Sequence, residues 1–161
     1  MTPDLVRRTP SAKWLGLAGF GVAAAAAALI GGLGVAGTVA EYQSLRQPAW
    51  APPSWLFGPV WTVLYVLIAV SGWLVWRRTG WTSALTVYAV QLALNAAWTP
   101  IFFTGHAIGA GLIVVAMLLV MVLWTIRLTW RFDRVAAWLL VPYAAWVAFA
   151  TLLNAAILRM N

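Results

Sequence analysis

The apolar positions of this chain form long continuous stretches, separated by single charged residues or small charged clusters. Each stretch is long enough to cross a bilayer, which requires about 20 residues. The longest uncharged stretch, between Arg78 and Arg127, has room for two crossings and contains a turn-forming cluster, Phe-Thr-Gly-His, at 103–106. The pattern therefore predicts an all-α membrane protein with five transmembrane helices in a single bundle. The expected spans are 14–40, 55–76, 81–103, 108–130 and 135–158.

Two polar segments precede the second expected span: a tail, 1–13, and a loop, 41–54. The loop contains three prolines, which exclude regular helix there because proline removes a backbone donor. Long loops with aromatic residues of their own are often functional lids. The alternative is that Trp50 and Trp55 belong to the aromatic belt found at membrane interfaces.

Composition and charge agree with a membrane protein. Only 8% of the 161 residues are charged, whereas about a quarter are charged in a soluble domain. Of the ten basic residues, eight lie on the side that holds the N-terminus and the second and fourth loops. This positive-inside bias places the N-terminus in the cytoplasm and the 41–54 loop outside. The net charge of +7 then reflects topology and contact with anionic lipid, and we expect no nucleic-acid partner.

The chain lacks the residues that most catalytic and metal sites require. It has no cysteine, which excludes disulfides, thiolate catalysis and cysteine-bound metals. The three acidic residues, Asp4, Glu41 and Asp133, lie in expected tails or loops, so proton relays, carboxylate pairs and catalytic triads have no parts within the membrane. A lone loop histidine such as His106 is more often an interfacial polar residue than a haem-iron ligand. We therefore assign no metal site and no acid–base catalytic residue.

One face of the third expected span combines aromatic and amide side chains. It carries Tyr88, Gln91, Asn95, Trp98 and Phe102, at intervals of three and four residues. Amides in hydrocarbon are costly unless they are partnered, so Gln91 and Asn95 must face the protein interior. They either form hydrogen bonds that set helix register or point with Trp98 into a polar and aromatic cavity. Pro100 predicts a distortion at the end of this helix.

The first expected span is rich in alanine and glycine, and Gly31, Gly34 and Gly37 recur every three residues. Small residues allow the backbones of neighbouring helices to approach closely. They also leave room for a flat ligand beside the helix. A helix-packing face and the wall of a ligand cavity are both open interpretations.

Aromatic residues are abundant, with 12 tryptophans, 4 tyrosines and 6 phenylalanines. Trp61, Trp98 and Trp146 lie well inside their expected helices, on the same faces as Tyr65, Asn95 and Asn154. Aromatic surface with a few hydrogen-bonding groups is typical of a site for a large, flat, mostly apolar ligand. Because indoles are oxidisable, a light-absorbing ligand against them would support photochemistry without any acid–base residue.

Four motifs in order carry a resemblance to a known family: QPAWAPP at 47–53, GPVWTVLY at 58–65, YAVQLALNAAWTPIFF at 88–103 and VPYAAWVAFATLLN at 141–154. Over roughly residues 41–154 the chain closely resembles the translocator protein / tryptophan-rich sensory protein family, also called the peripheral-type benzodiazepine receptor family. The resemblance implies a five-helix bundle, commonly a homodimer, that binds porphyrins and haem-like tetrapyrroles. Animal members also bind cholesterol and isoquinoline carboxamides, and some bacterial members resemble stress sensors or promote porphyrin photodegradation.

By position, the resemblance implies eight ligand-binding residues: Tyr42, Trp61, Tyr65, Asn95, Trp98, Trp146, Ala150 and Asn154. Among these, Trp61 and Trp146 correspond to the tryptophans implicated in porphyrin breakdown. The family's first-loop motif usually begins with lysine, and Gln47 stands there in this chain, which leaves Arg46 as the nearest partner for a porphyrin propionate. A proposed sterol element at the end of the fifth helix lacks its tyrosine before Arg159, so we do not expect sterol recognition by that element.

We therefore expect a membrane receptor or carrier that binds porphyrin or haem, without an obligatory cofactor. Its partners would be a planar hydrophobic small molecule, the lipid bilayer and a second copy of the chain. One alternative is a protein that degrades porphyrin in light and oxygen; another is an interaction or structural protein whose tryptophans act only as anchors. The expected location is a bacterial cell membrane, crossed several times.

Overall fold

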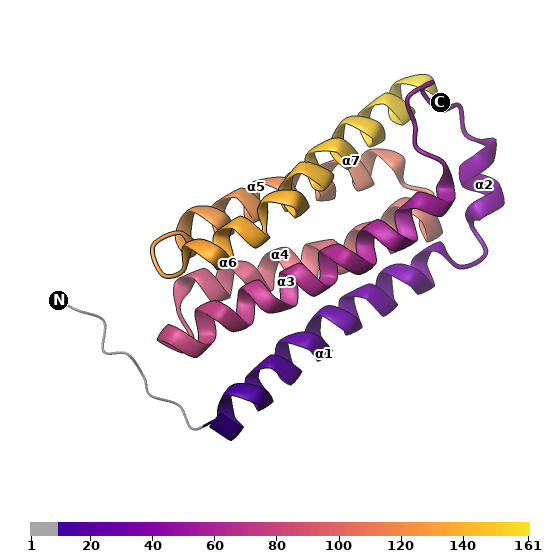
Figure 1. Ribbon diagram of the computed structural model, residues 1–161. Coiled ribbons are helices and arrows are strands. Elements are labelled where there is room, and N and C mark those ends of the chain that lie inside the picture. Colours follow the sequence, from indigo (N-terminus) through magenta and orange to yellow (C-terminus); the bar gives the residue numbers. More distant parts are fainter. Residues whose placement is uncertain (1–9) are drawn as a thin grey trace.

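A computed structural model describes residues 10–161, so residues 1–9 of the expected tail lie outside the described residues. The described chain is helical throughout, apart from connecting segments (Figure 1). Its α-helices are α1 (Pro10–Val35), α2 (Val39–Ser44), α3 (Phe57–Thr79), α4 (Ser83–Thr99), α5 (Ile108–Thr129), α6 (Arg134–Leu139) and α7 (Val141–Met160). A 3₁₀ turn, η1 (Ser54–Leu56), precedes α3, and a π-helical turn, η2 (Pro100–Thr104), follows α4.

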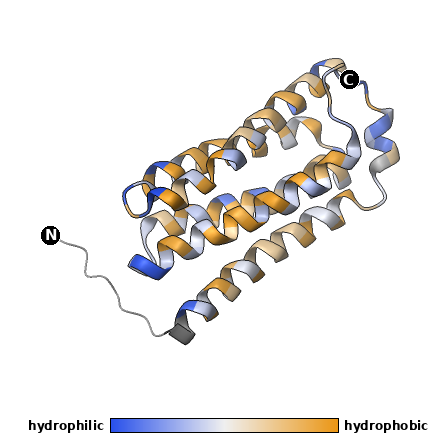
Figure 2. Cartoon of the chain, viewed as in Figure 1, coloured by the Kyte–Doolittle hydropathy of each residue, from blue (hydrophilic) through white to orange (hydrophobic). Residues whose placement is uncertain are grey.

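Five helical segments of the described chain are long and apolar enough to span a membrane: Lys13–Val35, Ser54–Thr79, Ser83–Thr104, Ile108–Thr129 and Arg134–Met160. Hydrophobic residues cover these helices along their lengths, and hydrophilic residues gather at their ends and on α2 (Figure 2). The predicted fold class, an all-α membrane protein with five spans, is confirmed.

The first span is shorter than predicted, because α1 ends at Val35 and not at residue 40. Gly37 adopts a φ of 82°, a left-handed value that glycine accommodates without a steric penalty. The Thr38 hydroxyl donates a 2.9 Å hydrogen bond to the Val35 carbonyl and helps to close this helix end. A new short helix, α2, starts at Val39. The expected 41–54 loop therefore begins with helical residues.

The fifth span was predicted as one helix, 135–158, but the structure divides it into α6 and α7 at Leu140. Pro142 has no N–H to donate to the carbonyl of Trp138, so the regular ladder is interrupted there. The Asp133 carboxylate accepts a 3.1 Å hydrogen bond from the Ala136 N–H and caps α6. The span Arg134–Met160 therefore consists of two consecutive helices.

The third span begins at Ser83, two residues later than expected, and changes to π-helix at Pro100. The Gly105 N–H donates to the Pro100 carbonyl over 2.8 Å, which closes a wide turn. The distortion predicted from Pro100 is confirmed. Phe102, in the π-helical turn, lies on the interior face expected for it and is 5% exposed.

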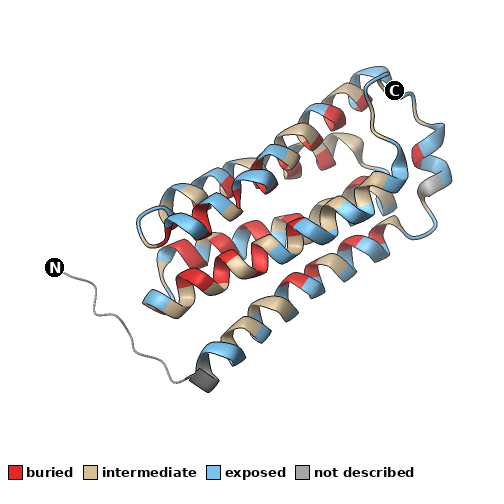
Figure 3. Cartoon of the chain, in the orientation of Figure 1, coloured by how far each residue is buried: buried red, intermediate tan, exposed pale blue. Residues whose placement is uncertain are grey.

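The core lies between α3, α4, α5 and α7, and α1 covers one side of it by packing against α3 and α4. Tyr143, Ile68 and Leu118 are among its fully buried side chains. Along α1, in contrast, the buried residues are all small (Figure 3): Ala24, Ala27, Gly31 and Gly34. Phe20 packs its ring against Trp76 and Tyr88, whereas the small buried residues let α1 approach its neighbours closely at some positions and leave space at others.

Candidate functional site

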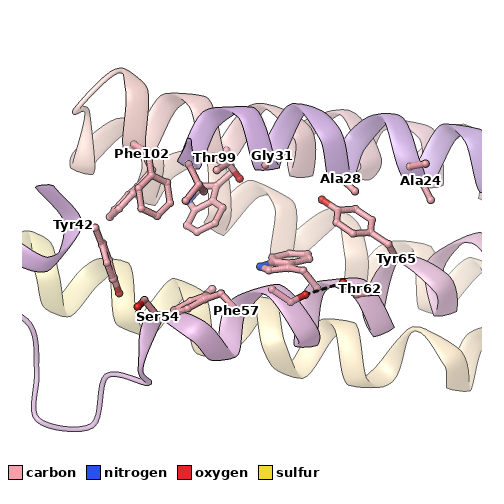
Figure 4. A pocket seen from close by; sticks show the side chains of 18 of the residues that line it. Ala24, Ala28, Gly31, Tyr42, Ser54, Phe57, Thr62, Tyr65, Thr99 and Phe102 are labelled. Atoms are coloured by element: carbon pink, nitrogen blue, oxygen red, sulfur yellow. Dashed lines mark hydrogen bonds between the residues drawn. The ribbon is translucent and has the colours of Figure 1, made fainter. Parts of the chain in front are cut away.

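A pocket of about 640 Å³ lies between α1 and α3, and α2 covers one end of it. Tyr42 and Phe102 stand at that end, and Tyr65 faces Ala28 at the other (Figure 4). The helices α4 and α7 and the π-turn complete the walls. The lining side chains that carry a ring or a polar group are Tyr42, Ser54, Phe57, Trp61, Thr62, Tyr65, Trp98, Thr99, Phe102, Phe103 and Asn154.

The small residues of α1 serve both of the functions that the sequence left open. A Cβ added at Gly34 would lie 2.8 Å from the backbone nitrogen of Pro100, so this glycine permits helix contact. A Cβ at Gly31 would lie 3.5 Å from the Thr99 hydroxyl oxygen and 3.7 Å from that of Tyr65, without a clash, and Gly31 lines the pocket. One helix face therefore packs at Gly34 and forms the pocket wall at Gly31.

Tyr42 closes the pocket from α2. Its ring lies 5.5 Å from the ring of Phe103 and 6.3 Å from that of Phe57, measured between centroids. The Gln47 side chain holds the backbone of Tyr42, since Nε2 of Gln47 donates a 2.7 Å hydrogen bond to the Tyr42 carbonyl. Burial raises the pKa of the Tyr42 hydroxyl, which has no hydrogen-bond partner in the described chain.

Two contacts attach the cover of the pocket, residues 39–46, to the rest of the protein. The Glu41 carboxylate lies 3.3 Å from Nδ1 of His106, in the loop between η2 and α5. The side chain of Asn161 accepts a hydrogen bond from the Arg46 N–H and donates another to the Arg46 carbonyl, both at 3.0 Å. His106 is exposed and does not line the pocket.

Six of the eight residues in the predicted ligand-binding set line the pocket: Tyr42, Trp61, Tyr65, Trp98, Ala150 and Asn154. Trp61 lies 5.5 Å from Tyr65, and Trp98 lies 5.7 Å from Phe102, between ring centroids. These rings give the pocket broad aromatic walls. The structure thus brings together most of a set that is scattered over four elements of the chain.

Asn95, the seventh member, lies behind the wall and does not line the pocket. Its side-chain oxygen accepts a 2.6 Å hydrogen bond from the Tyr65 hydroxyl, and its Nδ2 donates to the Tyr143 hydroxyl over 3.0 Å. The Tyr143 hydroxyl donates in turn to the Gln91 side-chain oxygen at 2.7 Å. The interhelical hydrogen-bond interpretation therefore describes both amides, and Asn95 reaches the pocket only through Tyr65.

Trp146, the eighth member, also lies outside the pocket lining. Its ring packs 5.8 Å from Phe57 and 5.4 Å from Phe149, between centroids. Phe57 lines the pocket, so Trp146 supports a wall residue from behind. Its indole N–H has no partner in the described chain.

Several buried polar atoms at the pocket lack a partner within the part of the chain that the structure describes. They include both amide atoms of Asn154, the indole nitrogen of Trp98 and the hydroxyl of Tyr42. Asn154 is only 2% exposed. Buried polar groups are nearly always hydrogen-bonded to protein, water or ligand, and an orphan group needs an explanation. These atoms are sealed from solvent, so a ligand with hydrogen-bonding groups would satisfy them once side chains of the pocket wall move.

Among the described residues, the pocket lining includes no acidic residue, no histidine and no basic residue. General acid–base catalysis by a pocket side chain therefore has no candidate. What the site offers is apolar and aromatic surface with a few hydroxyl, indole and amide groups, which is suited to binding.

Sequence reasoning missed several lining residues, among them Thr62, Thr99 and Phe103. Each directly follows a residue on a face that was singled out, namely Trp61, Trp98 and Phe102. A pocket between several helices is lined by a wider arc of each helix than the single stripe of residues that a three-to-four-residue spacing picks out. The π-turn widens this arc further for Phe103.

The sequence model of the TspO/MBR family matches residues 20–160. Human "Translocator protein" is 36% identical over 154 residues, which cover 92% of this chain and 91% of that protein. "Protein CrtK" of Rhodobacter capsulatus is 38% identical over 126 residues, or 76% and 79% of the two chains. "Tryptophan-rich sensory protein" of Cereibacter sphaeroides is 38% identical over 123 residues, or 74% and 76%.

Proposed function

Because this chain belongs to the TspO/MBR family, we propose that it is a membrane receptor or carrier that binds tetrapyrroles such as porphyrin or haem in the pocket under α2. The names of its relatives, which include the words translocator and sensory, support a role in sensing or carrying a ligand. No obligatory cofactor takes part, and the tetrapyrrole is itself the ligand.

The observation that carries this proposal is Asn154, whose two amide atoms lack partners in the described chain although the residue is 2% exposed in the wall of an aromatic pocket. A flat ligand with a hydrogen-bonding edge would stack on Trp61 and Trp98, and a movement of the wall side chains would bring the amide into contact with that edge. The pocket volume of about 640 Å³ falls in the range of small-molecule sites. A purely structural function would leave both features unexplained.

Titration of the purified protein with protoporphyrin, followed by the porphyrin absorbance band, tests the proposal. Ala150→Leu narrows the pocket, and we expect it to weaken binding about tenfold or more, since overpacking costs about 1–3 kcal/mol. Ala145→Leu is the matched control, because Ala145 lies on the same helix and is exposed. Equal affinity in the two variants would exclude this pocket as the porphyrin site.

The alternative function, porphyrin degradation in light and oxygen, is favoured by one specific observation. Trp61 lines the pocket, and its oxidisable ring lies 5.5 Å from Tyr65 and 6.2 Å from Tyr143, between centroids. Trp146 stands behind the wall and would act through Phe57. A time course of porphyrin absorbance with and without illumination separates the functions, because a binding protein leaves the pigment intact. Loss of the light-dependent decay in Trp61→Phe would identify the indole as a participant.

The assembly and orientation belong to the same proposal. We expect a homodimer, with the N-terminus in the cytoplasm and the 41–54 loop outside. Since the natural chain has no cysteine, a single cysteine at Ser44 would report the side of the loop by its reaction with a membrane-impermeant thiol reagent. Labelling from outside intact cells is the expected result.

A further inference from the structure

The pocket under α2 has an exposed side between α1 and α3. Its lining residues from α4, η2 and α7 are buried or half-buried, and Tyr42 on α2 is buried as well. The exposed lining residues belong to α1, η1 and α3, and they are Ala25, Gly32, Ser54, Gly58, Thr62 and Val66. Because α1 and α3 lie within membrane spans, this side of the pocket faces lipid. We call the opening between these six residues the α1–α3 slot.

The edges of the slot are small and mostly apolar. A Cβ added at Gly32 or at Gly58 would meet no atom within 4 Å, so the space beside both glycines is open. The Thr62 hydroxyl donates a 2.9 Å hydrogen bond to the Gly58 carbonyl of its own helix, which satisfies this donor as a lipid-facing group requires. The edges therefore let an apolar ligand pass without binding it through polar groups.

The slot lies within one leaflet of the bilayer. From Gly58 to Val66, α3 rises by about 12 Å at 1.5 Å per residue. One leaflet is roughly 15 Å deep, half of a 30 Å hydrocarbon core. Since the span begins at Ser54, at the end of the bundle that α2 covers, the slot opens into the leaflet on that side.

Contacts hold α1 in place on either side of the slot. At the end near α2, the Thr104 hydroxyl donates a 3.1 Å hydrogen bond to the Gly34 carbonyl. Toward the other end, a Cβ added at Gly72 of α3 would lie 2.7 Å from the ring of Phe20, so the two helices are in direct contact there. The width of the slot is therefore set by the side chains between these contacts.

The aqueous side of the pocket is closed, in contrast. The Tyr42 side chain is buried and packs against the rings of Phe57, Phe102 and Phe103, at centroid distances of 6.3, 6.5 and 5.5 Å. A ligand that entered from water would have to displace these rings and break the contacts that attach the cover. A ligand dissolved in the bilayer meets an opening that is already exposed.

We propose that the ligand enters the pocket sideways from the membrane, through the α1–α3 slot, and not from water under α2. This inference rests on the proposed function, because it names the route to the same pocket. It also narrows the class of ligand to molecules that dissolve in the hydrocarbon of a bilayer before they bind. Such molecules are planar and apolar with few charged groups, since charges are costly to bring into hydrocarbon.

Narrowing the slot should slow binding and release alike. Ala25→Leu/Val66→Phe adds bulk to both edges. The two helices run antiparallel (Figure 1), so moving six residues along each from the contact of Phe20 with Gly72 brings Val66 level with Ala26, next to Ala25. A narrower entrance raises the barrier in both directions. We expect the association and dissociation rates of protoporphyrin each to fall about tenfold, with a change of less than about threefold in Kd.

The matched control is Ala18→Leu/Val63→Phe. It makes the same two substitutions on the same two helices, at exposed positions that do not line the pocket. Stopped-flow quenching of tryptophan fluorescence by protoporphyrin in proteoliposomes measures association, and transfer of bound porphyrin to excess empty vesicles measures dissociation. Both double variants share the step in which porphyrin partitions into the bilayer, so a difference between them reports on entry. Melting curves show that each variant is folded.

Slower association and slower release in Ala25→Leu/Val66→Phe alone support entry through the slot. Equal rates in the two double variants would overturn it and leave the pocket as the binding site. Weaker binding through faster release, with unchanged association, would also overturn it, because the added bulk would then act on the bound ligand. Absence of quenching in the natural protein would overturn the proposed function, and this inference with it.

Discussion

The hydroxyl of Tyr65, on α3, donates a 2.6 Å hydrogen bond to the side-chain oxygen of Asn95, on α4. Tyr65 lines the pocket, and Asn95 is 3% exposed behind it. From Asn95 the hydrogen bonds continue to Tyr143 on α7 and back to Gln91 on α4. The pocket wall is thus one end of a buried chain of hydrogen bonds that joins three spans.

Replacing Asn95 with leucine should destabilise the bundle. The change breaks two hydrogen bonds between spans, and such bonds contribute about 0.6 to 1.7 kcal/mol each. It also leaves the Tyr143 hydroxyl without its donor from Asn95 in a fully buried position. We expect a loss of about 1–3 kcal/mol in the free energy of unfolding, measured by denaturation with sodium dodecyl sulfate in mixed micelles.

Tyr65→Phe is the control for this network, because it breaks only the outer hydrogen bond and keeps the ring. Its expected cost is about half of that of the Asn95 variant. A Tyr65→Phe protein as unstable as Asn95→Leu would show that the inner bond from Asn95 to Tyr143 contributes nothing.

Adding a single methyl group at Gly34 should separate α1 from the third span. The new Cβ would lie 2.8 Å from the backbone nitrogen of Pro100, and backbone atoms cannot move aside as a flexible side chain can. Gly34→Ala should therefore lower the melting temperature, with a cost of about 1–3 kcal/mol. Gly19→Ala, which has no atom within 4 Å of its added Cβ, should melt like the natural protein. Identical melting of both variants would refute close packing at Gly34.

Much of the fold could be predicted, because the apolar stretches that become spans are directly visible in the sequence. The ends of the helices were harder to predict from the sequence. The end of α1 depends on the left-handed conformation of Gly37, and glycines at 31 and 34 in the same helix remain helical. Nothing in the sequence distinguishes one of these glycines from another, since the difference lies in what each residue contacts.

The candidate site shows the same limit. The interior position of Asn95 followed from the cost of burying an amide, but its partners Tyr65 and Tyr143 lie 30 and 48 residues away. Trp146 was placed on one face with Asn154, eight residues later. At 3.6 residues per turn, eight residues leave the two side chains about 80° apart, which is enough to put Asn154 in the pocket and Trp146 behind Phe57.

Asn161→Leu should loosen the cover of the pocket. The amide of Asn161 makes two 3.0 Å hydrogen bonds to the backbone of Arg46, and leucine has a similar size but no polar atom. The Arg46 N–H should then exchange with solvent faster, by about tenfold for the loss of one hydrogen bond of roughly 1.4 kcal/mol. Hydrogen exchange followed by mass spectrometry measures this rate. Ser44→Ala, which removes a local bond to the Glu41 carbonyl, is the control and should leave Arg46 protected.

Alkaline pH should open the same cover through Tyr42. Burial raises the pKa of its hydroxyl in the closed state, so the closed state holds the phenolic proton more tightly than an open state with the ordinary pKa of about 10. The stabilisation of the closed state is therefore complete below pH 10 and is lost as the pH rises above that value. Tyr42→Phe keeps the ring, removes a hydroxyl without a partner in the described chain, and should remove this alkaline step. Hydrogen exchange of α2 between pH 9 and 11, corrected for the intrinsic rate, measures the opening, and an unchanged step in Tyr42→Phe would assign it to another group.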